Sequence, residues 1–293
     1  MAINYASLFL SQIEQQYSRE LTSSALDRNK KFNFLNAKTV NVPTMVLSGY
    51  KDHARDGSKN RGNVNNTYQP MAMAHDRDIE FFVDEADVDQ TNLALSSANV
   101  TATFNAEQAI PELDAYRYSK LHADFVTAGG VLDGTVLSKV NILTQFDAYM
   151  EAMDEAGVPE EGRVLYVIPK VYTMLKQAEA IQKTLEVTGG VKDVNRKVRS
   201  IDDVEIVKVP SARMKSAYDF TEGFVPAVAA KQINMILVHP MSVIAPIKYT
   251  DIYLWNKGET PDSAFGFLYQ NRSYVDLFLI TAKKAGVKIN ADA

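Results

Sequence analysis

One segment constrains the fold of this chain more than any other: Gly49–Asn66, GYKDHARDGSKNRGNVNN. It contains four basic residues, two acidic residues, one histidine and three glycines, and almost nothing that could enter a core. It lies between two strand-like sequences, VPTMVL (Val42–Leu47) and DIEFFVD (Asp78–Asp84). A loop longer than about 12–15 residues with no structure of its own is normally either functional or disordered. The segment is therefore the first candidate for a functional surface.

The composition otherwise fits an ordinary folded protein. A length of 293 residues suggests about two lobes, and the chain is 46% hydrophobic and 23% charged. It has no cysteine, which excludes a disulfide framework, a thiolate zinc site and a cysteine nucleophile, and fits a reducing cytosol. The net charge of −5 argues against a dedicated nucleic-acid-binding protein. We also find no signal-peptide pattern and no apolar run near the roughly 18 residues of a membrane span.

The N-terminal residues 1–36 predict a polar, helical arm. Tyr5, Phe9, Ile13 and Tyr17 recur at steps of four and would form one apolar stripe on a helix. Such an arm is expected to become ordered on contact with a partner.

A long helix is predicted from about Ser97 to Val126. The sequence VTATF within it also alternates like a strand, so both interpretations exist for that part. Pro111 would either kink the helix or begin its second half, and Gly129–Gly130 would end it. Two pairs of opposite charge have the spacing of helical neighbours, namely Asp114 with Arg117 and Lys120 with Asp124.

The remaining sequence predicts a mixed α/β middle and a β-rich end. An apolar face that includes Lys139, Leu143, Phe146, Met150 and Met153 predicts a helix ending at Gly157. A second helix should begin at Pro169, with an apolar face of Val171, Met174, Leu175, Ala178 and Ile181. Strands are predicted for RVLYVI, DVEIVKVP, INMILVHP and VIAPIKYTDIYLW, and for FGFLYQNRSYVDLFLITAKKAGVKI with a turn near Lys284–Gly286.

Motifs that carry chemistry are missing from the sequence. It has no P-loop, dinucleotide fingerprint, His-Glu-x-x-His or Gly-x-Ser-x-Gly pattern, and its four histidines lie in four separate segments. Asp84–Thr91 contains three aspartates but lacks the glycine and glutamate of a calcium hand, so we interpret it as a strand end leading into a helix cap. Glu112 and Asp114 are interpreted as acids that complement the dipole of a helix N-terminus.

The joint order of several segments resembles the major capsid proteins of tailed bacteriophages, most closely those of phages and prophages of Gram-positive bacteria. The most specific are Pro111–Arg117 (PELDAYR), His239-Pro240 at a strand end, and the final strand with Arg272, Asp276 and Phe278. The resemblance covers nearly the whole chain, and none of these pieces is an active-site motif.

The resemblance implies an α+β fold of the Hong Kong 97 type, with an arm, an extended hairpin called the E-loop, a peripheral domain with a long spine helix, and an axial domain. On this chain the expected limits are 1–36 for the arm, 37–80 for the E-loop and its strands, 81–134 for the peripheral domain, 135–255 for the axial domain, and 256–293 for the return to the peripheral domain.

The implied function is structural: a capsid subunit that self-assembles into pentamers and hexamers of an icosahedral shell, in the virion, after assembly in the host cytoplasm. The implied partners are further copies of the chain, with scaffold, portal and decoration proteins, while packaged DNA is confined without specific binding. No cofactor, metal or catalytic residue is predicted. Contacts to neighbouring subunits are expected from the E-loop residues Lys51, Arg55, Lys59 and Arg61 and from the arm residues Tyr5, Phe9, Ile13 and Tyr17.

Two alternatives belong to other classes of protein. The chain could be a soluble α/β enzyme in which residues 49–66 form an active-site lid, although no convergent set of polar groups is recognisable. It could also bind nucleic acid through Lys51–Arg61, although this segment lacks the several aromatic side chains of a stacking platform. A covalent crosslink from Lys51 or Lys59 has no matching asparagine or glutamate motif, so no residue is assigned to one.

Overall fold

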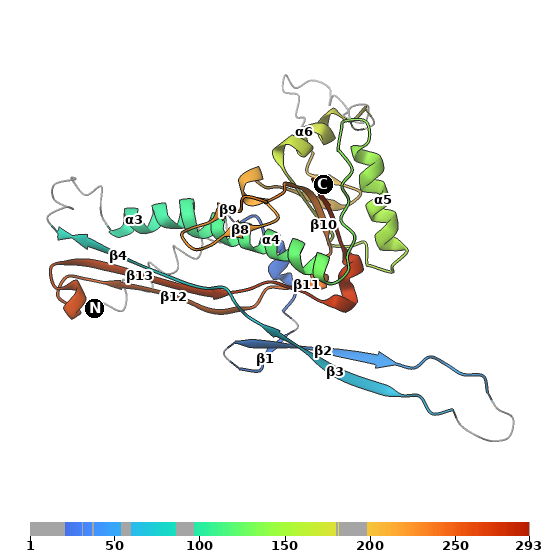
Figure 1. Cartoon of the computed structure of the whole chain (residues 1–293), viewed down its shortest axis with the longest axis horizontal. Coiled ribbons are helices and arrows are strands. Elements are labelled where there is room, and N and C mark those ends of the chain that lie inside the picture. The colour runs from blue at the N-terminus through green and yellow to red at the C-terminus, as the bar shows by residue number, and fades with distance from the viewer. Residues whose placement is uncertain are drawn as a thin grey trace, which may run out of the picture.

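A long helix lies along a narrow β-ribbon in the computed structural model, with a compact lobe at one end and a hairpin that projects beyond it (Figure 1). The structure describes residues 21–30, 32–36, 38–53, 60–85, 97–179, 181 and 198–292. The arm residues Tyr5, Phe9, Ile13 and Tyr17 therefore lie outside the described residues. So do Arg55 and Lys59, and most of the aspartate-rich segment 84–91.

The predicted long helix is present, and it contains a wide turn. It consists of α3 (Ser97–Phe104), a π-helical segment (Asn105–Ala109) and α4 (Ile110–Thr127). Pro111 lies in the first turn of α4, where its missing N–H removes no hydrogen bond from α4 itself. The widened turn before it gives the proline ring room that a regular helix would not. Gly129 follows the helix with a φ of 74°, as a helix-ending glycine should.

The β-ribbon beneath the helix is an antiparallel sheet of three strands in the order β12-β13-β4. Its strands are β4 (Asp76–Asp84), β13 (Gly266–Val275) and β12 (Ile247–Trp255). Alternate residues of β4 face the helix. The ring centroid of Phe81 lies 5.3 Å from that of Phe104 in α3 and 6.1 Å from that of Tyr269 in β13. This contact between aromatic side chains joins the ribbon to the N-terminal half of the helix.

The compact lobe contains a five-stranded sheet in the order β15-β10-β5-β7-β6. Its strands are β5 (Val164–Val167), β6 (Ser200–Ile201), β7 (Val204–Lys208), β10 (Ile233–Val238) and β15 (Val287–Ala291). The helices α5 (Ile142–Asp154) and α6 (Pro169–Gln177) pack on it. The last strand pairs with β10, so the end of the chain joins the sheet of the middle third. The domain limits themselves remain a prediction.

The predicted helices of the lobe are shorter than their apolar patterns. Lys139 lies before α5, in a turn that leads into the helix. In this turn the backbone N–H of Ser138 donates to the side-chain oxygen of Asn141 at 2.7 Å. Ala178 has extended backbone, so α6 ends before it. The short elements are η1 (Ser24–Arg28), β1 (Asn33–Phe34), η3 (Ser211–Arg213), β8 (Tyr218–Asp219), β9 (Val225–Pro226), η4 (Pro240–Ser242), β11 (Val243–Ile244), η5 (Pro261–Ser263), β14 (Phe278–Leu279) and η6 (Thr281–Gly286).

The projecting hairpin is formed by β2 (Thr39–Leu47) and β3 (Val64–Ala72), which pair from Thr39 with Ala72 to Leu47 with Val64. The sequence predicted β2 but not β3, whose residues Asn65, Asn66 and Pro70 have low strand propensity. Pairing with β2 therefore decides the conformation of β3. The long polar loop is correspondingly shorter than the sequence suggested, because part of it continues the ladder.

Candidate assembly surfaces

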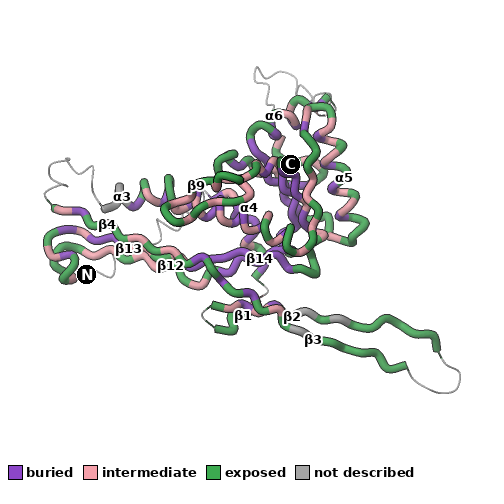
Figure 2. Tube along the Cα trace, viewed as in Figure 1, coloured by how far each residue is buried: buried purple, intermediate pink, exposed green. Residues whose placement is uncertain are grey.

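The hairpin is buried at its base and exposed towards its tip (Figure 2). At the base, Val40, Val42, Met71 and Met73 pack against residues of the ribbon and of β14 in a small hydrophobic cluster. Beyond them the exposed large apolar side chains are those of Met45, Leu47, Tyr50, Val64 and Tyr68, with exposed fractions between 61% and 108%. Exposed apolar side chains gathered on one projecting element mark a surface for another protein.

The tip of the hairpin carries the predicted basic residues that the structure describes. Lys51 and Arg61 are both exposed. The ladder extends one step past the strands, because the N–H of Ser48 donates to the carbonyl of Asn63 at 3.1 Å and the N–H of Asn63 donates to the Ser48 hydroxyl at 2.8 Å. Within the described residues, neither Lys51 nor Arg61 forms an ion pair in its own subunit.

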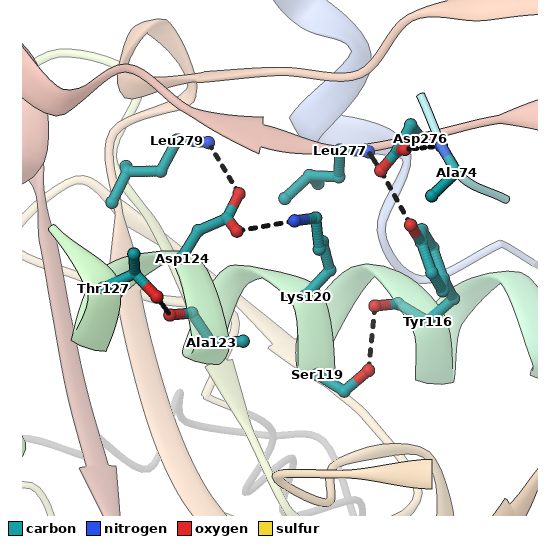
Figure 3. Close-up of polar contacts among 10 residues, drawn as sticks. All are labelled: Ala74, Tyr116, Ser119, Lys120, Ala123, Asp124, Thr127, Asp276, Leu277 and Leu279. Atoms are coloured by element: carbon teal, nitrogen blue, oxygen red, sulfur yellow. Dashed lines mark hydrogen bonds and ion pairs between the residues drawn. The ribbon is translucent and has the colours of Figure 1, made fainter. Parts of the chain in front are cut away.

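A buried carboxylate fixes the base of the hairpin to the long helix. Asp276, at the end of β13, accepts hydrogen bonds from the Tyr116 hydroxyl at 2.8 Å, the Ala74 N–H at 2.8 Å and the Leu277 N–H at 2.7 Å (Figure 3). Burial raises the pKa of Asp276 and also that of Tyr116. Three separate parts of the chain meet at this carboxylate, so the direction of the hairpin depends on the position of the helix.

A second contact follows one helical turn further along. Lys120 pairs with Asp124 at 2.7 Å, which confirms the pair predicted from their spacing. The other oxygen of Asp124 accepts from the N–H of Leu279 in β14 at 3.3 Å (Figure 3). The pair therefore also joins the helix to the strand that follows Asp276.

The other predicted pair is wrong. Asp114 is fully buried and accepts from the N–H of Ser23 at 3.0 Å, the hydroxyl of Thr22 at 2.6 Å and a guanidinium nitrogen of Arg213 at 3.1 Å. Arg117 is buried too, and it pairs with Asp27 at 2.7 Å.

The side chains of Asp114 and Arg117 both face residues 22–28, the segment that follows the arm. They therefore bond to partners that are distant in sequence and not to each other. Asp114 is thus a structural acceptor, and the interpretation that it only complements a helix dipole is wrong. Sequence reasoning missed this role, although the charged residues inside an otherwise apolar helix face were visible.

A cavity of about 310 Å³ separates the π-helical segment from the ribbon. Its polar end contains Glu112, which pairs with Arg77 at 2.7 Å, and His75, whose Nε2 lies 3.8 Å from the same Glu112 oxygen. Burial raises the pKa of Glu112 and lowers that of His75 to about 4. His75 stacks on Tyr116 with ring centroids 3.8 Å apart. The sequence did not predict this cluster, because its members are distant in the chain.

His75 gives a testable pH dependence. In the unfolded chain its pKa has the ordinary value of about 6.5, so between pH 6.5 and about 4 the unfolded chain binds more protons than the folded one. Stability therefore falls as the pH falls through this window. We expect His75→Phe to remove as much as roughly 3 kcal/mol of that loss, measured by urea unfolding at pH 7 and pH 4.5. His75→Gln should flatten the pH dependence equally. A wild-type slope in both variants would contradict the assignment.

The structure brings no catalytic constellation to the hairpin. His53, His75, His122 and His239 lie in separate parts of the described chain, and the residues described include no group of three or more acidic or histidine side chains that could hold a metal ion. Among them, no helix is long and apolar enough to cross a membrane. The hairpin of β2 and β3 projects away from α3 and from the part of the ribbon beneath it (Figure 1).

Comparisons with known proteins identify the fold. The sequence matches no family model and no curated protein. The structure resembles one from Mycobacterium phage Che8, with 14% identity and a TM-score of 0.61, over 86% of this chain and 84% of that one. It also resembles the capsid structure of cyanophage P-SCSP1u, with 13% identity and a TM-score of 0.57, over 87% and 84% of the two chains.

A third structure is from the mature capsid of bacteriophage PhiM1, with 14% identity and a TM-score of 0.60, over 86% and 81% of the two chains. The similarity covers most of both chains in each of these comparisons. The chain therefore has the α+β fold of phage capsid proteins, the Hong Kong 97-type fold that the sequence predicts.

Proposed function

We propose that the chain is the major capsid subunit of a tailed bacteriophage and that it assembles into the pentamers and hexamers of an icosahedral shell. The observation that supports this most is the hairpin: its base is built into the fold, while its outer part exposes five large apolar side chains. Exposing them costs free energy in an isolated subunit, and a neighbouring copy can recover it. The capsid fold of the chain agrees with this function.

The proposed contacts have the geometry of shell assembly. A subunit that inserts a projection into its neighbour makes a heterologous contact, and such contacts form a ring when the rotation between neighbouring subunits closes. The hairpin supplies apolar side chains and the basic residues Lys51, Arg55, Lys59 and Arg61, which are expected to meet acidic surfaces of adjacent subunits. Weak contacts repeated over many copies make a closed shell stable.

Other parts of the proposal come from the resemblance in the sequence. Scaffold, portal and decoration proteins are the expected partners, and assembly is expected in the cytoplasm of the host bacterium before the subunit becomes part of the virion. DNA inside the shell would be confined and not bound specifically. In this role the chain needs no cofactor and catalyses no reaction.

Electron microscopy and light scattering of the purified protein, co-expressed with neighbouring scaffold and protease genes, test the proposal. We expect closed shells or capsomers. A product that stays monomeric under all these conditions would overturn it. The alternatives have their own signatures: strong DNA affinity that falls steeply with added salt would favour a nucleic-acid-binding protein, and turnover of a small molecule would favour an enzyme.

A further inference from the structure

The hairpin continues into the ribbon through a short linker, residues 73–75, which follows β3 and precedes β4. Hydrogen bonds to the end of β13 hold the backbone of this linker. The Ala74 N–H donates to the carboxylate of Asp276 at 2.8 Å, and the His75 carbonyl accepts from the Val275 N–H at 3.2 Å. The linker is therefore a joint at which the direction of the hairpin relative to the ribbon is fixed.

The side chain of His75 is buried at this joint. Its ring stacks on Tyr116 of α4 with the ring centroids 3.8 Å apart, and it meets the edge of the Phe220 ring at 5.4 Å. The hydroxyl of Tyr116 donates to Asp276, the same carboxylate that accepts from the Ala74 N–H (Figure 3). The His75 ring thus packs against the tyrosine that supports the joint.

The charged groups around His75 favour its neutral form. Burial and, after it, the charge of Arg77 lower the pKa of His75, against a smaller opposite effect of Asp76. The nearby carboxylates already have partners, since Glu112 pairs with Arg77 at 2.7 Å and Asp76 pairs with Arg272 at 2.7 Å. A protonated ring at this position would be a buried cation beside a second cation, which is costly.

Water offers a protonated His75 a better environment than the joint does. If the ring turns out into solvent, the imidazolium regains its hydration, but the stacking on Tyr116 is lost. The two conformations therefore bind protons differently, and acid shifts the equilibrium towards the one in which the ring is exposed. The apolar cluster at the base of the hairpin, which includes Val40 and Met71, does not titrate and keeps the hairpin attached.

We propose that residues 73–75 form an acid-sensitive hinge: in weakly acidic solution the His75 ring leaves its site against α4, and the hairpin loses the fixed direction that it has at neutral pH. The inference goes beyond the capsid function and does not depend on it, because it concerns the isolated subunit. The opening is local. The lobe and the long helix keep their buried contacts, so the hinge opens at a lower cost in free energy than global unfolding.

The size of the effect follows from proton linkage. The pKa of His75 is about 4 with the ring buried and has the ordinary value of about 6.5 with the ring in water. Between pH 7 and pH 4.5 this difference raises the ratio of open to closed hinges by roughly 60-fold. Burial raises the pKa of Glu112 and that of Asp276, so protonation of these carboxyls favours the closed hinge and opposes the effect. The contribution of His75 is therefore measured as a difference between the wild-type protein and a His75 variant.

Hydrogen exchange at the linker measures the opening even when it is rare. The Ala74 N–H is protected by its bond to Asp276, and its exchange in the full-length, unassembled subunit gives an opening constant once the intrinsic pH dependence of exchange is divided out. From pH 7 to pH 4.5 the rise of this constant in the wild-type protein should exceed that in His75→Phe by roughly 60-fold. His122→Phe removes another histidine of α4 whose pKa is lowered by burial, and it should respond as the wild-type protein does.

Spin labels follow the direction of the hairpin itself. Since the protein has no cysteine, Asn65→Cys on β3 and Lys170→Cys on α6 place two unique labels at exposed positions. We expect a narrow distribution of distances at pH 7 and a broader one at pH 4.5, with recovery at pH 7. A pair within the lobe, Ala148→Cys with Lys170→Cys, should give the same distances at both pH values.

Three results would overturn the proposal. The first is an opening constant that does not rise in acid, and the second is an equal rise in the His75 variants. The third is an equal loss of protection in β5 and β10, which would mean global unfolding. If His75→Phe does not fold, His75→Gln removes the titrating group with a polar side chain. Shell formation, scored separately, tests the capsid function and not this inference.

Discussion

Deleting Lys51–Arg61 is expected to leave a folded subunit that no longer forms shells. The deletion joins Leu47 to Val64 through the five residues Ser48–Tyr50 and Gly62–Asn63, a length that hairpin loops commonly have. The base of the hairpin keeps its buried cluster and the hydrogen bond from the Ala74 N–H to Asp276. The free energy of unfolding should therefore change by no more than about 0.5 kcal/mol, while shell formation falls below detection in electron microscopy.

The loss of assembly can be divided between charge and apolar contact. Lys51→Glu with Arg61→Glu reverses the charge of the two basic residues described at the tip, and Leu47→Ser with Val64→Ser removes an exposed apolar pair. Lys170→Glu with Lys176→Glu is a matched control on α6. We expect shells from the control and few or none from the other two variants. If the deletion instead unfolds the subunit, the hairpin tip is part of the core and the E-loop assignment is wrong.

The replacement Asp114→Ala should destabilise the subunit by about 3–5 kcal/mol, the usual effect of removing one partner of a buried ion pair. It leaves the Arg213 guanidinium and the N–H groups of Thr22 and Ser23 without their acceptor, next to the buried Arg117. Chemical denaturation monitored by circular dichroism measures the change.

An exposed ion pair is the control for this result. Arg28 and Glu205 form an ion pair at 3.2 Å with side chains 49% and 57% exposed, and such pairs contribute about 0–1 kcal/mol. Glu205→Ala should therefore change stability by less than about 1 kcal/mol. If Asp114→Ala and Glu205→Ala lowered the free energy of unfolding equally, the prediction that the buried Asp114 stabilises the subunit more than an exposed ion pair would be wrong.

The sequence by itself determined the elements that local chemistry specifies. Strand β2 contains the strand-like sequence Val42–Leu47 and ends at the same residue, because alternating and β-branched residues favour a strand. The long helix follows from its apolar spacing, and the Lys120–Asp124 pair follows from the four-residue step of a helix. The ordered set of segments also indicated the capsid fold. The strand and helix signals are contained within short windows of the chain, whereas the resemblance depends on the order of segments over nearly all of it.

Only the tertiary structure decided the features that depend on distant partners. Strand β3 exists because β2 supplies its hydrogen bonds, against the preferences of its own asparagines and proline. Asp114 and Arg117 do not pair with each other, because residues 22–28 and Arg213 supply buried partners for them. Leaving a buried charge without a partner costs far more free energy than an ion pair between helical neighbours contributes. The cavity at Asn105 lies between a π-helical turn and three strands, β4, β12 and β13, that are distant in sequence from one another or from the helix. Such sites arise only when folding has brought their walls together.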